Sequence, residues 1–341
     1  MRSPAGLRKR GGPPYRTHPE PEGHPTYSDG PRLPTVGRHI VKTIVVVGAT
    51  GTQGRAVTAH LLAAGRHVRA VTRDPDTAPA RTLARAGAEL VRAEMDDVAS
   101  LVAAAEGAHG LFSVQPTVGS PGTPAGFSAE DEVRWGRNVA DAAHAAGVRH
   151  LVYASLAGAG RHDTEKLPLN TVSKWRVEQH ITRLGLPATF LRPVSFMENY
   201  TGAYHLHDGA VATAFAADVP QQIMAVDDVG AFAALAFARP DEWIGRAVDL
   251  AGDELTPRQI AAAISEAIGR PLPYVRIPIE VIARAGEEFA FAYGWLNERG
   301  YRADVAFTRA LHPGLMDLRT WLRRTGAARI AGFLAAAEGD R

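Results

Sequence analysis

The chain has 341 residues, of which 45% are hydrophobic and 22% are charged, and it contains no cysteine. A chain of this length and balance can bury the core of one large α/β domain or of two smaller ones. The lack of cysteine excludes disulfides, thiolate catalysis and cysteine-ligated zinc, so any redox role requires a bound cofactor.

The basic character of the sequence, with a pI near 9.0, comes from its first 40 residues. This segment carries seven Lys/Arg against three Asp/Glu, a net charge of +4, which leaves −2 on the remaining 301 residues. We therefore expect no direct nucleic-acid binding by the body of the protein. Because 1–40 is rich in Pro and Gly and poor in apolar residues, we predict a disordered basic tail, either genuine or a mis-assigned start. No apolar run reaches the roughly 18 residues of a membrane span, so no membrane partner and a cytoplasmic location are expected.

From residue 41 onward, strands alternate with helices. The predicted strands are 41–47, 67–72, 88–92, 110–114, 151–155 and 189–192, and the predicted helices are 52–64, 77–86, 97–106, 129–146 and 169–184. Fully apolar strands such as 41–47 are typical of a parallel sheet buried on both faces. The alternation predicts right-handed βαβ crossovers, and hence an α/β fold with a doubly wound parallel Rossmann sheet over 41–194.

The region 195–330 has a different pattern. Short strands at 247–251 and 274–277 stand among helices at 229–238, 257–268, 279–291 and 318–323. We predict a smaller C-terminal α/β lobe for substrate or effector, which completes a pocket at the carboxyl ends of the sheet strands. With the Rossmann core it forms a single unit over 41–330.

Three glycines stand between the first predicted strand and the first predicted helix, in the segment GATGTQG. Pyrophosphate oxygens reach a helix N-terminus only where no side chain holds them away. At this place in a βαβ unit the pattern is a strong dinucleotide fingerprint, and the alternative is a tight turn without a ligand. The expected cofactor contacts in this turn are Gly48, Thr50, Gly51, Thr52, Gln53 and Gly54.

The residues after the next two strands bear on the type of dinucleotide. Arg73 comes 19 residues after Gly54, and its guanidinium matches a 2′-phosphate, so NADP(H) is preferred and NAD(H) is the second option. Asp74 would instead cap the next helix, or bind the ribose hydroxyl if the register shifts by one. Asp96 is expected to face the adenine edge or to cap the helix near Val98.

The chain resembles the short-chain dehydrogenase/reductase superfamily, and within it the NmrA-like group of atypical members, over roughly residues 42–325. The phrases that carry the resemblance are GATGTQGRAV, AVTRDP, AEMDDVASL, HLVYASLAG, SKWRVEQHI, GLPATFLRPVSFMEN, VDDVGAFAA and LHPGL…WL. The resemblance implies an NAD(P)-binding Rossmann fold. It adds Gln115, Lys174 and Pro193 to the expected cofactor contacts, and Phe196, Met197 and Asn199 to the expected substrate pocket. The histidines form no convincing metal set, so no metal is expected.

Catalytic members of the superfamily carry a tyrosine four residues before a lysine, so that both side chains reach the cofactor from one helix face. Here Lys174 is that lysine, expected at the cofactor ribose, and Asn170 replaces the tyrosine. An amide does not titrate usefully and cannot serve as the general acid or base. An alternative register pairs His162 with Lys166 in a predicted loop. Ser155 resembles the serine that orients a substrate carbonyl, or it only ends a strand.

These features leave two functions open. The first is an NADP(H)-binding redox or dinucleotide sensor that acts on a regulatory protein partner, as the resemblance implies for NmrA-like proteins without the tyrosine. The second is an atypical NADPH-dependent oxidoreductase that reduces a quinone or another small carbonyl or aromatic acceptor. A quinone substrate needs little acid catalysis from the enzyme. Both a monomer and a homodimer fit the sequence.

Overall fold

The computed structural model describes residues 42–118, 123 and 126–339, and the predicted disordered tail 1–40 lies outside them. A seven-stranded sheet has the order β11-β6-β5-β4-β1-β2-β3, and all of its pairs are parallel. Its strands are β1 (Thr43–Val47), β2 (His67–Thr72), β3 (Glu89–Arg92), β4 (Gly110–Ser113), β5 (His150–Ala154), β6 (Ala188–Pro193) and β11 (Ala247–Leu250). The strand order reverses at β1, which pairs with β2 on one side and β4 on the other, and open α/β folds bind ligands at this switch point.

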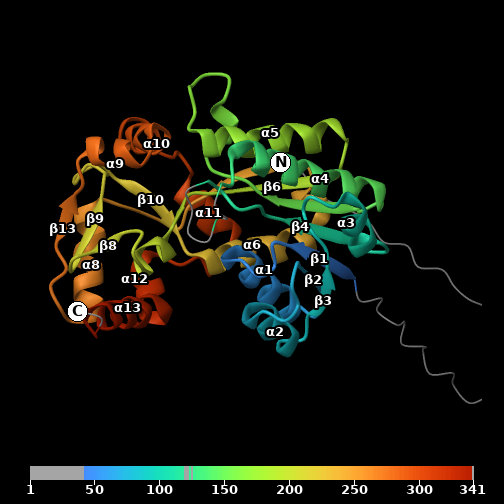
Figure 1. The fold of residues 1–341 in the computed structure, drawn as a ribbon, viewed down its shortest axis with the longest axis horizontal. Coiled ribbons are helices and arrows are strands. Elements are labelled where there is room, and N and C mark those ends of the chain that lie inside the picture. Colours follow the sequence, from blue (N-terminus) through green and yellow to red (C-terminus); the bar gives the residue numbers. More distant parts are fainter. Residues whose placement is uncertain (1–41, 119–122, 124–125, 340–341) are drawn as a thin grey trace, which may run out of the picture. The chain divides into compact units, whose positions relative to one another are not determined.

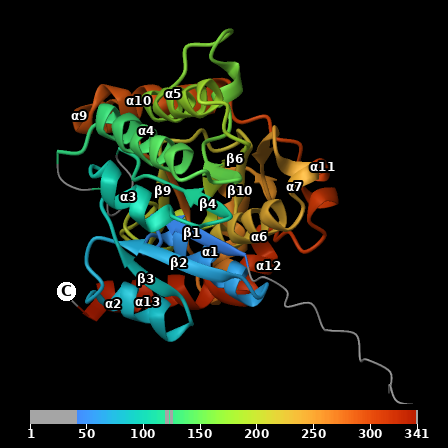
Figure 2. The ribbon, with the colours of Figure 1, turned by 90° about the vertical axis from the view of Figure 1, so that its right-hand side faces the viewer.

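Helices cover both faces of the sheet (Figures 1 and 2). One face carries α1 (Thr52–Ala63), α2 (Ala78–Arg85) and α6 (Val226–Ala238), and the other carries α3 (Val98–Ala105), α4 (Ala129–Ala145) and α5 (Leu169–Arg183). Successive side chains of a strand point to opposite faces. Ile44 and Val46 accordingly join the first cluster, whereas Val45 and Val47 join the second. The predicted doubly wound parallel Rossmann fold is confirmed.

The other elements lie mainly beyond the end of the sheet that carries the glycine turn (Figure 1). Two three-stranded sheets have the orders β12-β10-β7 and β13-β9-β8. The short strands are β7 (Ser195–Phe196), β8 (Leu206–His207), β9 (Ala210–Thr213), β10 (Gln221–Met224), β12 (Asp253–Leu255) and β13 (Tyr274–Arg276). The helices are η1 (Ala159–Arg161), η2 (Met197–Thr201), α7 (Pro240–Trp243), α8 (Pro257–Ile268), α9 (Ile279–Ala285), α10 (Glu287–Glu298), α11 (Val305–Leu311), α12 (Leu318–Trp321), η3 (Leu322–Gly326) and α13 (Ala327–Gly339). A third apolar cluster lies around η2, α8 and α12, whereas Trp243 of α7 belongs to the first cluster of the main sheet.

The structure differs from the sequence-based expectation in this later region. The strand expected at 247–251 within the smaller lobe is β11, which pairs with β6 as an edge of the main sheet. The helix expected at 229–238 is α6, which begins at Val226 and packs against α1. The helix expected at 279–291 is two helices, separated at Gly286, whose φ is +156°. Hydrophobic pattern alone does not say which sheet a short strand joins, because that choice depends on distant partners.

Candidate dinucleotide site

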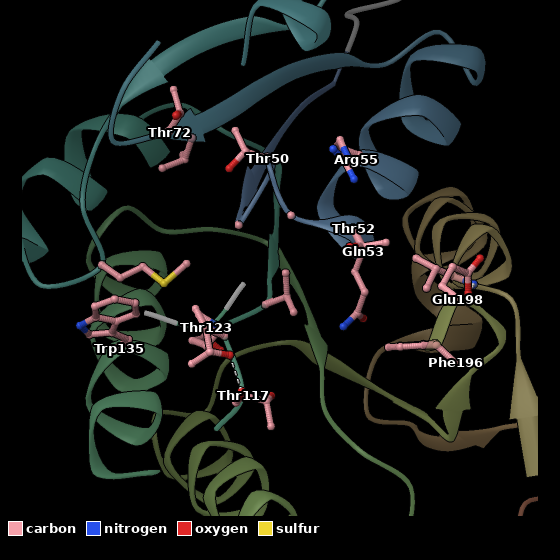
Figure 3. Close-up of a pocket in the computed structure, with 18 of the residues that line it drawn as sticks. Thr50, Thr52, Gln53, Arg55, Thr72, Thr117, Thr123, Trp135, Phe196 and Glu198 are labelled. Atoms are coloured by element: carbon pink, nitrogen blue, oxygen red, sulfur yellow. Dashed lines mark hydrogen bonds between the residues drawn. The ribbon is translucent and has the colours of Figure 1, made fainter. Parts of the chain in front are cut away.

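A cavity of about 1030 Å³ lies at the carboxyl ends of β1, β2 and β4, next to the switch point. This volume lies at the upper end of the roughly 300–1,000 Å³ of small-molecule sites. Figure 3 shows Thr50 and Gln53 of the glycine turn facing Trp135 and Thr117 across the cavity. Phe196 and Glu198 lie next to Gln53, on the side of the cavity opposite Trp135. The cavity thus extends from the main sheet to the residues that follow β6.

The glycine turn is built so tightly that side chains cannot replace two of its glycines. Gly48 has φ +79°, and a Cβ there would lie 2.6 Å from the carbonyl oxygen of Val114. A Cβ on Gly54 would lie 2.1 Å from the carbonyl oxygen of Gly48, so α1 packs directly on the turn. Gly51 is the N-cap of α1 and lies at the cavity wall. Gly48 and Gly51 therefore border the cavity, while Gly54 holds the helix against the turn.

The start of α1 offers unpaired hydrogen-bonding groups to the cavity. No side chain caps this helix, and its first turn has no acidic residue, so the positive end of its dipole is open to an anion. Thr50, Thr52 and Gln53 line the wall beside it. The buried Oε1 atoms of Gln53 and Gln115 have no hydrogen-bond partner among the described residues. Buried polar atoms are normally paired, so these two acceptors are suited to the donor groups of a bound ligand. The site therefore fits a dinucleotide.

At the end of β2, Arg73 lines the cavity and Asp74 does not. The Oδ1 atom of Asp74 accepts a hydrogen bond of 2.8 Å from the backbone N–H of Asp76. Thr77, rather than Asp74, caps α2 by accepting from the N–H of Ala80. Asp74 thus serves its own turn, and its expected role as the cap of α2 is wrong, while its contact with the ribose hydroxyl stays a prediction. Arg73 forms no ion pair within the described part of the chain and keeps its guanidinium available for a ligand.

Asp96 also lines the cavity, close to Trp135. Its Oδ1 atom accepts a bond of 2.8 Å from Nε of Arg134, and this hydrogen bond lowers the pKa of the Asp96 carboxyl. The cap of α3 is the neighbouring Asp97, which accepts from the N–H of Ser100. Of the two roles expected for Asp96, capping is therefore wrong, and the place at the cavity edge remains.

Lys174 lies outside the cavity wall, in a buried ion pair between α4 and α5. Its Nζ atom is 2.8 Å from Oε1 of Glu132, and the two side chains are 5% and 0% exposed. Glu132 also accepts bonds of 2.6 Å from Oγ of Ser173 and 3.0 Å from Oγ1 of Thr117. Thr117 itself lines the cavity, so Glu132 joins the cavity wall to Lys174. The sequence analysis missed Glu132, and its only signal was its place in three successive acids at the start of a predicted helix.

The other expected catalytic positions, Asn170 and Ser155, and the expected cofactor contact Pro193 are also not among the residues that line the cavity. Asn170 is in the first turn of α5, where its side chain accepts a long bond of 3.4 Å from Thr171. Ser155 is buried with no partner for its Oγ among the described residues, and Pro193 ends β6. In the alternative register, His162 stacks on Trp175 at a ring distance of 4.1 Å and Lys166 lies over the ring of Phe291. Both residues precede the start of α5 at Leu169, so the alternative pair does not share a helix face.

The expected substrate residues separate into two groups. Phe196 and Asn199 line the cavity, whereas Met197 is fully buried in the core around η2. Met197 instead packs with Tyr200 in this core, on the side of η2 away from the cavity. Glu198 and Tyr204, which follow the same strand, also line the cavity. Further lining residues that sequence reasoning did not assign include Arg55, Met95, Trp135, Val226 and Arg329. Arg329 lies on α13, far along the chain from the other wall residues, and no local pattern identifies it.

A doubly wound sheet with a glycine turn and a cavity at its switch point belongs to the Rossmann class, in which dinucleotides bind at this point. The sequence model of the NmrA-like family matches residues 41–321. The chain therefore belongs to the NmrA-like family, as the resemblance predicted.

Relatives in this family include enzymes and regulators. A (4-alkanoyl-5-oxo-2,5-dihydrofuran-3-yl)methyl phosphate reductase of Streptomyces griseus is 34% identical over 71% of this chain and 79% of its own length. The structure of NmrA, a negative transcriptional regulator in complex with NADP, is 25% identical with a TM-score of 0.68, over 88% of this chain and 97% of that one. An NADPH-dependent quinone oxidoreductase of Escherichia coli, complexed with NADPH, is 26% identical with a TM-score of 0.66, over 82% and 98%.

Proposed function

We propose that this protein binds NADP(H) in the cavity at the switch point and acts as a dinucleotide sensor. The observation that carries the proposal is the cavity itself, which brings together the uncapped start of α1, the Oε1 atoms of Gln53 and Gln115, and Arg73. Within the described ranges, neither of these oxygens has a hydrogen-bond partner and Arg73 has no ion pair. The α1 N-terminus would hold the pyrophosphate, and Arg73 would hold the 2′-phosphate. Asp96, beside Trp135, would face the adenine. The NADP-bound structure of NmrA supports this assignment.

The sensor function is supported by the lack of a suitable proton donor among the described residues near the expected reaction centre. Asn170 stands where the catalytic tyrosine would be, and an amide cannot supply a proton. Lys174 is held by Glu132 and does not line the cavity. Glu198 does line the cavity, but both of its carboxylate oxygens already accept hydrogen bonds, from the N–H of Val226 and from Nε1 of Trp321. Burial raises the pKa of this carboxyl, and the two hydrogen bonds oppose that rise. Because both oxygens are already engaged by these donors, Glu198 does not take the place of the tyrosine hydroxyl.

A second candidate function, NADPH-dependent reduction of a quinone or related acceptor, is favoured by one specific observation. The cavity continues past the glycine turn to Phe196, Asn199 and Tyr204, and so leaves space beside the cofactor for another molecule. NADPH supplies a hydride when bound. The chain would then only bind and orient the acceptor, because a quinone takes its proton from water. The quinone reductase and the phosphate-ester reductase among the relatives support this candidate.

Titration with NADPH and with NADH tests the binding proposal. In Arg73→Ala we expect the Kd for NADPH to rise about 10-fold, because a charge-assisted contact to a phosphate is lost, and the Kd for NADH to stay unchanged. Arg92→Ala is the matched control, since Arg92 ends the neighbouring strand β3 and does not line the cavity. Equal NADPH affinities of the wild type and Arg73→Ala would contradict the assignment. Stopped-flow oxidation of bound NADPH by a panel of quinones then separates the two functions, and turnover would favour the reductase.

A further inference from the structure

The cavity has a second half that the dinucleotide assignment does not use. Its wall is formed by residues of β7, η2, the loop after η2 and α13, none of which belongs to the glycine turn or to the ends of β2 to β4. Phe196, Asn199, Tyr204 and Arg329 are the members that matter here. The helices that carry Asn199 and Arg329 pack against each other, so these two residues belong to one local assembly.

Two aromatic rings give this half an apolar wall. Phe196 lines the cavity directly, and Tyr204 is 42% exposed there. The ring of Tyr204 stacks on the buried ring of His205, with centroids 4.7 Å apart and planes at 30°. Burial lowers the pKa of His205 to about 3, so its ring is neutral and serves as an apolar support. A supported aromatic ring binds flat conjugated molecules with little loss of side-chain freedom.

The same half contains the guanidinium of Arg329. Burial raises the pKa of Glu198, and the positive charge of Arg329 acts on that carboxyl to oppose the rise. Arg329 forms no ion pair or hydrogen bond with any residue in the described ranges. The nearest acid in the wall is Glu198, whose Oε2 accepts from the Val226 N–H at 3.0 Å and whose Oε1 accepts from Nε1 of Trp321 at 3.1 Å. Because Glu198 is bound by these two donors, the guanidinium of Arg329 keeps its hydrogen bonds for a ligand. The side-chain amide of Asn199 likewise makes no hydrogen bond within the described part of the chain.

We propose that this half of the cavity binds a planar aromatic molecule that carries an anionic group, such as a carboxylate, phosphate or sulfonate. The ring lies against Phe196 and Tyr204, and the anionic group binds to Arg329, with Asn199 as a further polar contact. Guanidinium recognises such oxyanions through paired N–H donors. The inference rests on the proposed function because it assumes that the dinucleotide occupies the half of the cavity beside the glycine turn. It applies equally to an acceptor that is reduced and to an effector that is sensed.

Two probes of equal ring size test the proposal, namely naphthalene-2-sulfonate and the uncharged 2-naphthol. We expect calorimetric titration of the NADPH-loaded wild type to give tighter binding for the sulfonate. In Arg329→Gln the sulfonate should weaken about 5- to 10-fold and 2-naphthol should not change, since a partly exposed charge-assisted contact is lost. Tyr204→Ala should weaken both probes by a similar factor. Arg323→Gln is the matched control, because this exposed arginine bonds Thr320 and does not line the cavity.

The outcomes separate this inference from the proposed function. Equal affinities of the two probes for the wild type, or an equal loss of both in Arg329→Gln, would overturn the anion site. The probe titrations are repeated without dinucleotide, and NADPH binding is measured separately. Failure to bind NADPH would overturn the proposed function, whereas the charge selectivity that depends on Arg329 can still be read in the dinucleotide-free protein. Retained folding of Arg329→Gln is checked by its thermal unfolding.

Discussion

The glycine turn and the α4–α5 helix pair both carry residues that the superfamily uses around its cofactor. The two regions differ in whether those residues line the cavity. In the glycine turn, Gly48 and Gly51 border the cavity and Gly54 holds α1 against the turn. In the helix pair, Lys174 is present but is buried against Glu132, away from the cavity wall. A binding motif within one short segment keeps its geometry, whereas a catalytic pair depends on what the neighbouring helix places opposite it.

The largest expected effect lies in the glycine turn. In Gly54→Ala the new Cβ would meet the Gly48 carbonyl oxygen at 2.1 Å, so α1 must move away from the turn. We expect a loss of at least about 3 kcal/mol in the free energy of unfolding. Because the helix N-terminus moves with it, NADPH affinity should fall on the order of 100-fold. Urea unfolding and NADPH titration measure the two effects. Gly332→Ala, in open space on α13, is the control and should leave both nearly unchanged; a similar loss there would contradict the steric explanation.

The next effect tests the buried ion pair. Glu132→Gln leaves the ammonium of Lys174 buried without its counter-charge, and we expect a loss of about 3 kcal/mol in the free energy of unfolding. The double variant Glu132→Gln/Lys174→Met should recover part of that loss, because no uncompensated charge remains. Glu130→Gln breaks an exposed pair with Arg176 on the same two helices and should change stability little. Equal urea midpoints for Glu132→Gln and Glu130→Gln would show that the buried Glu132–Lys174 pair contributes no more to stability than the exposed Glu130–Arg176 pair.

A pH-dependent effect is expected at the support of the glycine-turn helix. Asp228 on α6 is 2% exposed, and burial raises its pKa to about 7, with Asp227 and Glu198 adding to the rise and His60 opposing it. His312 faces the same carboxylate at 3.9 Å. The folded state therefore holds a proton that the unfolded state releases near pH 4. The contribution of Asp228 to the free energy of unfolding is therefore greatest below pH 4. It falls as the pH rises toward 7, by up to about 1.4 kcal/mol per pH unit.

Asp228→Asn should flatten this part of the stability profile, measured by urea unfolding between pH 4 and 7. Asp227→Asn serves as a control of opposite sign. A hydrogen bond from His60 lowers the pKa of Asp227, so its contribution is present at neutral pH and is lost as the pH falls. An unchanged slope in Asp228→Asn would contradict the assignment of the raised pKa to Asp228.

The smallest effect is expected for a variant in the α4–α5 helix pair that tests whether this region can take part in catalysis. Asn170→Tyr restores the tyrosine four residues before Lys174, and we expect no measurable gain in NADPH-dependent reduction of an aromatic ketone. The reason is that Lys174 is held by Glu132 and that neither position 170 nor position 174 lines the cavity. NADPH oxidation followed by absorbance checks this, with Asn170→Phe as the control without a hydroxyl. A clear gain in the tyrosine variant alone would mean that Asn170 is the only barrier to catalysis.

Much of the Rossmann sheet could be predicted because its evidence is local. Strands such as Val45–Val47 are apolar throughout, and the helices between them show their own start and stop residues, so periodicity locates both. The later region could not be assigned in the same way. The strand at 247–250 has four residues, and only its pairing with β6 shows that it belongs to the main sheet. Gly286 divides a predicted helix because its φ of +156° interrupts the helical backbone, which composition does not show.

The sequence by itself determined that a glycine turn follows the first strand, that Arg73 ends the second, and that Asn170 replaces the tyrosine, because each of these is a property of neighbouring residues. Only the tertiary structure decided that Asp74 serves its own turn, that Glu132 holds Lys174, and that Arg329 reaches the cavity from α13. The contacts of Glu132 and Arg329 depend on residues that meet across long sequence distances, whereas Asp74 bonds Asp76 in a local turn whose geometry the residue types leave open. Charge, hydrogen bonding and burial act through distance in space, and folding alone sets that distance.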